Sequence, residues 1–77
     1  MEDRNLNIKS VNKFESMLKT NSFLFFDSNE FEEIITYYLD TGKISLAKKA
    51  SKLACEQYPY STSLNLMIVE ISILENN

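Results

Sequence analysis

The sequence has no histidine and only one cysteine, one glycine and one proline among its 77 residues. Without histidine, the chain lacks the side chain that most often serves as a general base and as a metal ligand. The single cysteine, Cys55, cannot form a disulfide within the chain and has no histidine to activate it, so we interpret it as structural. One glycine is too few for a glycine-rich phosphate loop. We therefore predict no catalytic residue, no metal, no cofactor and no enzymatic activity.

Long apolar runs and an excess of positive charge are missing as well. No apolar run approaches the ~20 residues of a membrane span, and the polar N-terminus lacks the apolar segment of a signal peptide. The formal net charge of −3 opposes non-specific nucleic-acid binding, which depends on a surplus of lysine and arginine. We expect a cytoplasmic protein with neither a membrane nor a nucleic acid as partner.

The strongest pattern in the chain is one complete helix–turn–helix. Asp27 is a good N-cap for its first helix, and Glu30 lies three residues later, where it can complete a capping box. Phe26 and Phe31 flank this box at the spacing of a hydrophobic staple. The helix then carries an apolar stripe at helical spacing. The stripe consists of Phe31, Ile34, Ile35, Tyr38 and Leu39.

Gly42, the only glycine, follows the last apolar residue of this first helix and suits a left-handed C′ position. A second helix is predicted from Ser45 to Gln57, and Pro59 prevents it from continuing. Its inward side is rich in alanine, which allows a close approach to the first helix, and its lysines face mostly outward. The inward residues are Leu46, Ala47, Ala50, Leu53 and Ala54; the outward lysines are Lys48, Lys49 and Lys52.

This helix pair resembles the tetratricopeptide repeat, which has a large residue, leucine, glycine and tyrosine on its first helix. Alanine, a large residue and alanine follow on the second helix, and then proline. Ile35 replaces the usual small residue and Ser51 the usual aromatic one, so the copy is degenerate. The resemblance covers about 34 residues and implies an all-α fold, a short superhelical array of about four helices. The matching residues are Phe31, Ile34, Ile35, Tyr38, Ala47, Ser51, Ala54 and Pro59.

Around this repeat we divide the chain into three parts. Residues 1–26 form an N-terminal helix and an aromatic connector, residues 27–60 form the repeat, and residues 61–77 form the first helix of a second, incomplete repeat or a closing helix. The N-terminal helix is expected to have about three turns, after frayed residues 1–7, with Asn7 or Ser10 as its N-cap. Its apolar residues are Ile8, Val11, Phe14, Met17 and Leu18.

The connector contains the aromatic run Phe23 to Phe26 between two turn signals. We interpret the run as an extended or helical segment whose rings pack between the helices. The alternative is an exposed aromatic patch that contacts a partner, but an exposed apolar run would be a liability.

The last helix is predicted from Leu64 to Glu75 and has two apolar faces. A helix that is apolar on both sides is expected to lie between two neighbours, yet the chain ends at Asn77 before a partner helix could follow. Either the chain is the front part of a longer repeat protein, or this helix self-associates and the chain forms a homo-oligomer. The residues predicted for self-association are Leu64, Met67, Ile68, Ile71 and Leu74; the other face has Leu66, Val69 and Ile73.

The resemblance implies a protein-interaction module, because the first helices of such repeats line a concave surface where peptides or partner helices bind. The first repeat helix has acidic residues and no basic one, so a basic or mixed partner segment is favoured. The plain alternative is that these charges only solvate the helix. By motif match the partner-binding residues are Asn29, Glu32, Thr36 and Asp40, with Ser63, Leu66 and Glu70 from the next helix.

A second hypothesis is a small helical regulatory or nucleic-acid-associated protein that uses Lys48, Lys49 and Lys52. A helix–turn–helix reader needs polar, base-reading residues at the start of its recognition helix and a basic surface. The residues from Ile44 to Ala47 do not supply the first, and the net charge opposes the second. We therefore prefer the interaction module.

Overall fold

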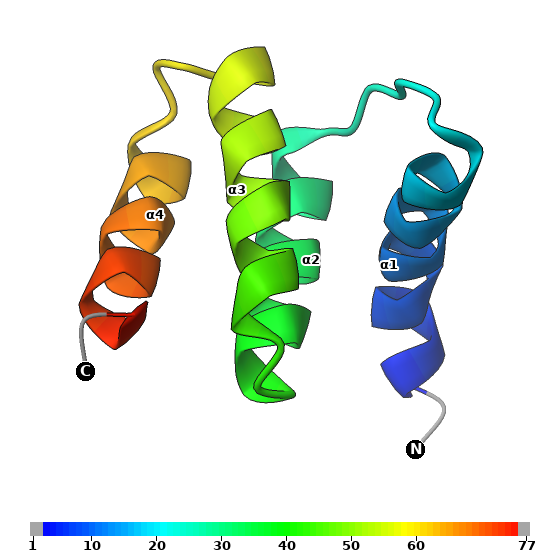
Figure 1. Cartoon of the computed structure of the whole chain (residues 1–77), viewed down its shortest axis with the longest axis horizontal. Coiled ribbons are helices and arrows are strands. Elements are labelled where there is room, and N and C mark those ends of the chain that lie inside the picture. Colours follow the sequence, from blue (N-terminus) through cyan, green and yellow to red (C-terminus); the bar gives the residue numbers. More distant parts are fainter. Residues whose placement is uncertain (1–2, 76–77) are drawn as a thin grey trace.

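The chain forms four α-helices and no strand within the part that the computed structural model describes, residues 3–75, with side chains from Lys9 to Glu75. Each helix packs against the next one along the chain, and the second also contacts the fourth (Figure 1). The predicted all-α fold with about four helices is confirmed. The helices are α1 (Asp3–Thr20), α2 (Ser28–Asp40), α3 (Ile44–Gln57) and α4 (Thr62–Glu75).

None of the described helices combines the length and the apolar character that a membrane crossing requires.

The start of α2 has the local structure that the sequence predicts. The backbone N–H of Asp27 donates a hydrogen bond to a carboxylate oxygen of Glu30 at 2.9 Å, which is the Glu30 half of the capping box. The rings of Phe26 and Phe31 lie with their centroids 5.2 Å apart, as the hydrophobic staple requires. This contact fixes the direction in which the chain enters α2.

The end of α2 is a Schellman motif built on Gly42. This glycine has φ = +76°, and its N–H donates to the Leu39 carbonyl at 3.2 Å. The N–H of Lys43 donates to the Tyr38 carbonyl at 2.8 Å. These two bonds satisfy carbonyls that the helix end would otherwise leave without a partner. The left-handed C′ glycine predicted from the sequence is confirmed.

Helix α1 is longer than predicted. It begins at Asp3, so Asn7 and Ser10 lie inside the helix, and neither is its N-cap. The apolar periodicity begins only at Ile8, but the polar residues before it include no glycine or proline that would break a helix. The expected fraying is therefore wrong from Asp3 onward, and residues 1 and 2 lie outside the described part. On the helix, Leu18 is 39% exposed instead of buried.

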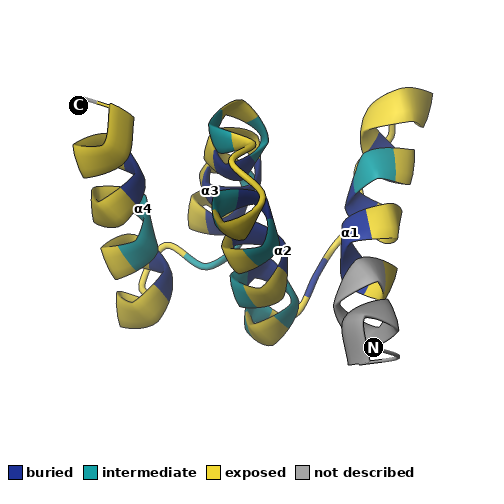
Figure 2. Cartoon of the chain, turned by 90° about the horizontal axis from the view of Figure 1, so that it is seen from below, coloured by how far each residue is buried: buried dark blue, intermediate teal, exposed yellow. Residues whose placement is uncertain are grey.

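The core is built around α2, which lies between the other three helices. The two predicted stripes of the repeat pack together, and the alanines of α3 allow its backbone to approach α2 closely. Ser51, which stands where the repeat family has an aromatic residue, is also buried. Figure 2 shows that the buried positions lie on the sides of the helices that face one another. The buried apolar residues are Val11, Phe14, Met17, Phe26, Phe31, Ile34, Ile35, Tyr38, Ala47, Ala50, Ala54, Leu64 and Ile71.

The aromatic connector corrects one prediction. Only Phe26 is buried, whereas Phe23 is 58% and Phe25 73% exposed, with Leu24 at 36%. The segment is extended, so successive side chains point to opposite sides, and when Phe26 points inward Phe25 must point outward. The expectation that all these rings pack between the helices is wrong, and the exposed aromatic patch is what the structure contains.

Helix α4 corrects a second prediction, because only one of its two apolar faces is covered. Leu64 and Ile71 are buried against the rest of the chain, but Leu66, Val69 and Ile73 are more than half exposed. Leu74 is also exposed. The helix therefore does not lie between two neighbours within this chain, and its outer side faces solvent (Figure 2).

Candidate interaction groove

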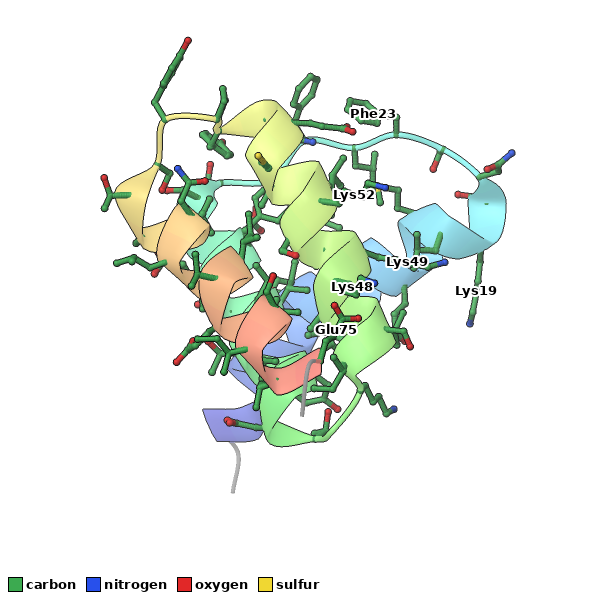
Figure 3. All side chains as sticks on the ribbon, turned by 60° about the vertical axis from the view of Figure 1, so that its left-hand side comes forward. Lys19, Phe23, Lys48, Lys49, Lys52 and Glu75 are labelled. Atoms are coloured by element: carbon green, nitrogen blue, oxygen red, sulfur yellow. The ribbon has the colours of Figure 1, made fainter. Side chains whose placement is uncertain are left out.

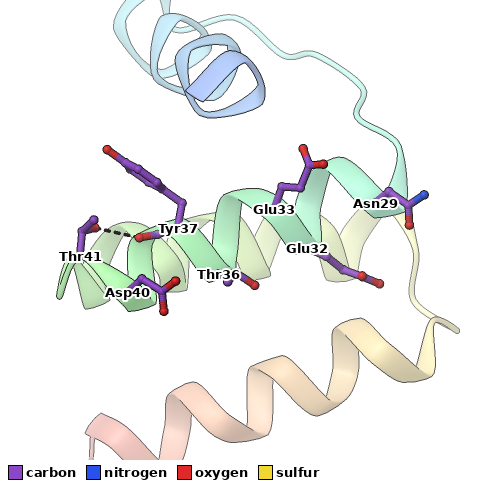
Figure 4. A pocket seen from close by; sticks show the side chains of 7 residues that line it. All are labelled: Asn29, Glu32, Glu33, Thr36, Tyr37, Asp40 and Thr41. Carbon is purple, nitrogen blue, oxygen red and sulfur yellow. Dashed lines mark hydrogen bonds between the residues drawn. The ribbon is translucent and has the colours of Figure 1, made fainter. Parts of the chain in front are cut away.

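A groove of about 610 Å³ runs along the outward surface of α2. Helices α1 and α4 lie on either side of α2 here (Figure 4). The four residues that we predict on α2 all line this groove, because their spacing places them on one side of the helix. The lining residues are Asn29, Glu32, Glu33, Thr36, Tyr37, Asp40 and Thr41.

A second groove of about 390 Å³ lies between α2 and α4 and shares Thr36 and Asp40 with the first. Glu70 lines it, so this predicted residue belongs to the same continuous surface as the α2 residues. Leu66 lines neither groove and faces solvent on α4. We refer to the two connected grooves as the acidic groove.

Among the described side chains, the groups that donate hydrogen bonds to carboxylates of the acidic groove are neutral hydroxyls. The hydroxyl of Ser63 donates to Glu32 at 2.7 Å, and the hydroxyl of Ser10 donates to Glu33 at 3.2 Å. Among the described side chains, the ion pairs lie elsewhere, and no lysine or arginine lines either groove. The negative charges of Glu32, Glu33, Asp40 and Glu70 therefore remain without a basic partner among the described side chains.

In the groove along α2, three lining residues were not among the predicted partner-binding residues: Glu33, Tyr37 and Thr41. With Asn29 they form a row at intervals of four residues on the side of α2 that faces α1 (Figure 4). The hydroxyl of Thr41 donates to the Tyr37 carbonyl at 2.9 Å and helps to close the last turn. Residues four apart are neighbours on a helix, so helical spacing alone could have predicted this row from the sequence. The tetratricopeptide pattern does not include these positions.

Of the five residues predicted for self-association, two are buried and three are at least partly accessible. Leu64 and Ile71 are 0% and 2% exposed, so they pack into this chain's own core and cannot contact a second copy. Met67 and Ile68 are partly covered, and Leu74 is exposed. The apolar residues that do face outward along the middle of α4 belong to the other stripe. Self-association itself stays a prediction, but its residues must include the outward ones.

Seen from the acidic groove, α3, which carries Lys48, Lys49 and Lys52, lies behind α2 (Figures 3 and 4). Lys48 forms an ion pair with Glu75 of α4 at 2.9 Å. Lys49 and Lys52 are exposed, and neither takes part in an ion pair among the described side chains. Helices α2 and α4 contain acidic residues and no basic one, so the chain separates its charges by helix.

Tyr38 and Cys55 are two further side chains whose chemistry depends on their surroundings. The buried Tyr38 hydroxyl donates to Glu15 at 2.7 Å; burial, and then this carboxylate, raise the pKa of Tyr38 above its ordinary value. Cys55 is an exposed thiol. Within the described residues, no three acidic or cysteine side chains are placed to hold a metal ion together.

The sequence matches no protein-family model, and no curated protein or solved structure matches it. The resemblance to the tetratricopeptide repeat stays a prediction from the sequence pattern.

Proposed function

We propose that this chain is a protein-interaction module of the tetratricopeptide-like kind, and that its acidic groove binds a basic segment of a partner protein. The observation that carries the proposal is the lining of the groove. Glu32, Glu33, Asp40 and Glu70 line one continuous concave surface, and no lysine or arginine stands among the lining residues from Lys9 to Glu75. A partner segment that brings lysine or arginine would supply the missing charge.

The spacing of the helices supports the repeat-like part of this proposal. Helix α2 begins at Ser28 and α4 at Thr62, an offset of 34 residues, and the tetratricopeptide repeat has a period of about 34 residues. The residue before each helix is a capping type, Asp27 for α2 and Ser61 for α4, and the Leu64 N–H donates to the Ser61 hydroxyl at 3.4 Å. Helices α2 and α4 also contact each other, as first helices of successive repeats do.

The binding test uses two fluorescently labelled peptides of equal length, one with alternating lysine and alanine and one with glutamate in place of lysine. The tested variant is Glu32→Gln with Asp40→Asn, which removes two groove charges and keeps the side-chain shapes. The matched control is Glu56→Gln with Glu75→Gln, which removes the same charge from residues outside the acidic groove. Fluorescence anisotropy measures the Kd of each peptide.

We expect the lysine peptide to bind the parent chain and the control with similar Kd, and the groove variant ~10-fold or more weakly, since two opposite-charge contacts are lost. The glutamate peptide should not bind. Equal weakening in the groove variant and the control would mean that only net charge matters, and the proposal would then be wrong.

The nucleic-acid hypothesis receives less support. Of its three lysines, Lys48 is already paired with Glu75 at 2.9 Å, which leaves Lys49 and Lys52 without an ion pair among the described side chains. Phosphate contacts are the main source of non-specific nucleic-acid affinity, and two lysines on a chain with net charge −3 supply few of them. We therefore do not propose it.

A further inference from the structure

The outer side of α4 is an apolar stripe with an acidic edge. Leu66, Val69 and Ile73 stand three and four residues apart, so they form one line along the helix, and each is more than half exposed. Glu70 lies beside this line, and α4 contains no basic residue. We call these four residues the α4 stripe. A line of exposed apolar residues at this spacing is the recognition surface of a helix that binds in a groove.

A groove of opposite charge lies between α1 and α3. Its volume is about 310 Å³, and its floor includes the apolar side chains of Met17, Leu18 and Leu53. Lys49 and Lys52 line it together with one acidic residue, Glu56. Figure 3 shows these lysines in a row along α3 with Phe23 beyond them. We call this the basic groove; it is separate from the acidic groove on α2.

The aromatic connector adjoins the basic groove and is held in place from both sides. The N–H of Leu24 donates to the sulfur of Met17 at 3.4 Å. The side-chain amide of Gln57 donates to the Leu24 carbonyl at 2.9 Å and accepts from the Phe26 N–H at 3.2 Å. The backbone that carries Phe23 and Phe25 is therefore held at these points, and their exposed rings lie edge to face with centroids 5.4 Å apart. Aromatic side chains that are already ordered lose little entropy when a partner covers them.

We infer that the α4 stripe of one copy of this chain docks into the basic groove of a second copy. The groove requires a helix with an exposed apolar line and an acidic edge, and α4 has both. In the docked pair Glu70 faces Lys49 and Lys52, so each surface supplies the charge that the other lacks. Because α4 and α1 lie at opposite ends of the molecule (Figure 1), a chain cannot fill its own basic groove.

An interface of this kind joins two different surfaces, so each added copy leaves one stripe and one groove free. Association is therefore open-ended unless the rotation between copies closes a ring. The α4 stripe shares Glu70 and Ile73 with the acidic groove, but the inference uses no residue of the α2 wall of that groove and does not rest on the proposed function.

The test reverses the charge of the α4 stripe in one variant and the charge of the basic groove in another. Sedimentation then measures the mass in solution over a range of protein concentrations. One variant is Glu70→Lys, and the other is Lys49→Glu with Lys52→Glu. The matched control for the second is Lys9→Glu with Lys43→Glu, which changes the net charge equally at exposed positions outside the basic groove. Circular dichroism establishes that each variant is folded. All changed residues are exposed in the monomer.

We expect the parent chain and the control to associate as concentration rises, and salt to weaken that association. Each charge variant alone should associate ~10-fold or more weakly, because like charges then face each other. An equimolar mixture of the two variants should associate again, since each stripe then meets a groove of opposite charge. This recovery is the result that a merely destabilised fold would not give.

Two results would overturn the inference. If the lysine-reversed variant still dimerises, the α4 stripes pair with each other and not with the groove. If the parent chain stays monomeric at all concentrations, a second copy is not the occupant of either surface. Lys49→Glu with Lys52→Glu leaves every carboxylate of the acidic groove intact, so peptide binding to that groove is measured independently in this variant. Glu70→Lys changes a residue of the acidic groove and is therefore used for the association measurement alone.

Discussion

Replacing Gln57 by alanine should release the aromatic connector from α3. The Gln57 amide makes two hydrogen bonds to connector backbone, one from the Phe26 N–H at 3.2 Å and one to the Leu24 carbonyl at 2.9 Å. Alanine can make neither bond. Three anchors remain. The Tyr58 hydroxyl donates to the Phe26 carbonyl at 2.6 Å, the Lys13 ammonium group donates to the Phe25 carbonyl at 3.0 Å, and the Leu24 N–H donates to the Met17 sulfur at 3.4 Å.

The size of the effect follows from where the two bonds lie. A typical hydrogen bond contributes about 0.5–1.5 kcal/mol, and a buried donor left without a partner costs about 1–3 kcal/mol. The bond to the Leu24 carbonyl is exposed, and water can replace it at little cost. The bond from the Phe26 N–H is partly buried. We therefore expect Gln57→Ala to lower the free energy of unfolding by about 1–2 kcal/mol.

Urea unfolding followed by circular dichroism measures this free energy, and hydrogen exchange measures protection of the Phe26 amide. Asn12→Ala, an exposed position on α1, is the control and should unfold like the parent chain. Gln57→Glu keeps an acceptor for the Phe26 N–H but loses the donor to Leu24, so it should fall between the parent and Gln57→Ala. If Gln57→Ala unfolds like the parent and its Phe26 amide exchanges no faster, the connector is not held as we describe.

Three further changes test the packing, each by urea unfolding. Gly42→Ala should cost about 1 kcal/mol through backbone strain alone, because an added Cβ meets nothing within 4 Å; equal stability would contradict the strain. Ala50→Leu should overpack the α2–α3 contact and cost ~1–3 kcal/mol; a neutral result would mean that the contact is loose. Because burial raises the pKa of Tyr38, its contribution to stability is full below the unfolded value of about 10 and falls as pH rises above it. Tyr38→Phe should therefore lose less stability between neutral and alkaline pH than the parent chain does, and parallel losses would rule this out.

The sequence was most informative where local rules act alone. The capping residues of α2, the left-handed Gly42 and the stop before Pro59 depend on neighbours within a few residues, and all are seen in the structure. The alanines of α3 predicted the close helix pair for the same reason, because helical spacing decides which side they occupy. The row from Glu33 to Thr41 obeys this rule too, although the repeat pattern does not mark it.

The exposed surfaces were harder to predict, because they depend on contacts between distant residues. Nothing near Phe25 in the sequence shows that Gln57 and Tyr58, more than thirty positions away, hold the connector extended. Apolar content alone predicted burial for Phe23 and Val69, but burial also needs a neighbouring element that covers the side chain. The start of α1 was missed because polar helix-forming residues give no periodic signal.

The order in which the helices pack has a consequence for how the chain folds and opens. Since each helix packs mainly against its sequence neighbour, most contacts close only short loops, which favours rapid folding. Such a chain also opens in steps and not all at once. Helix α4 buries only Leu64 and Ile71, so we expect it to open at a lower free energy than α2. Its amides should then exchange with solvent while those of α2 remain protected.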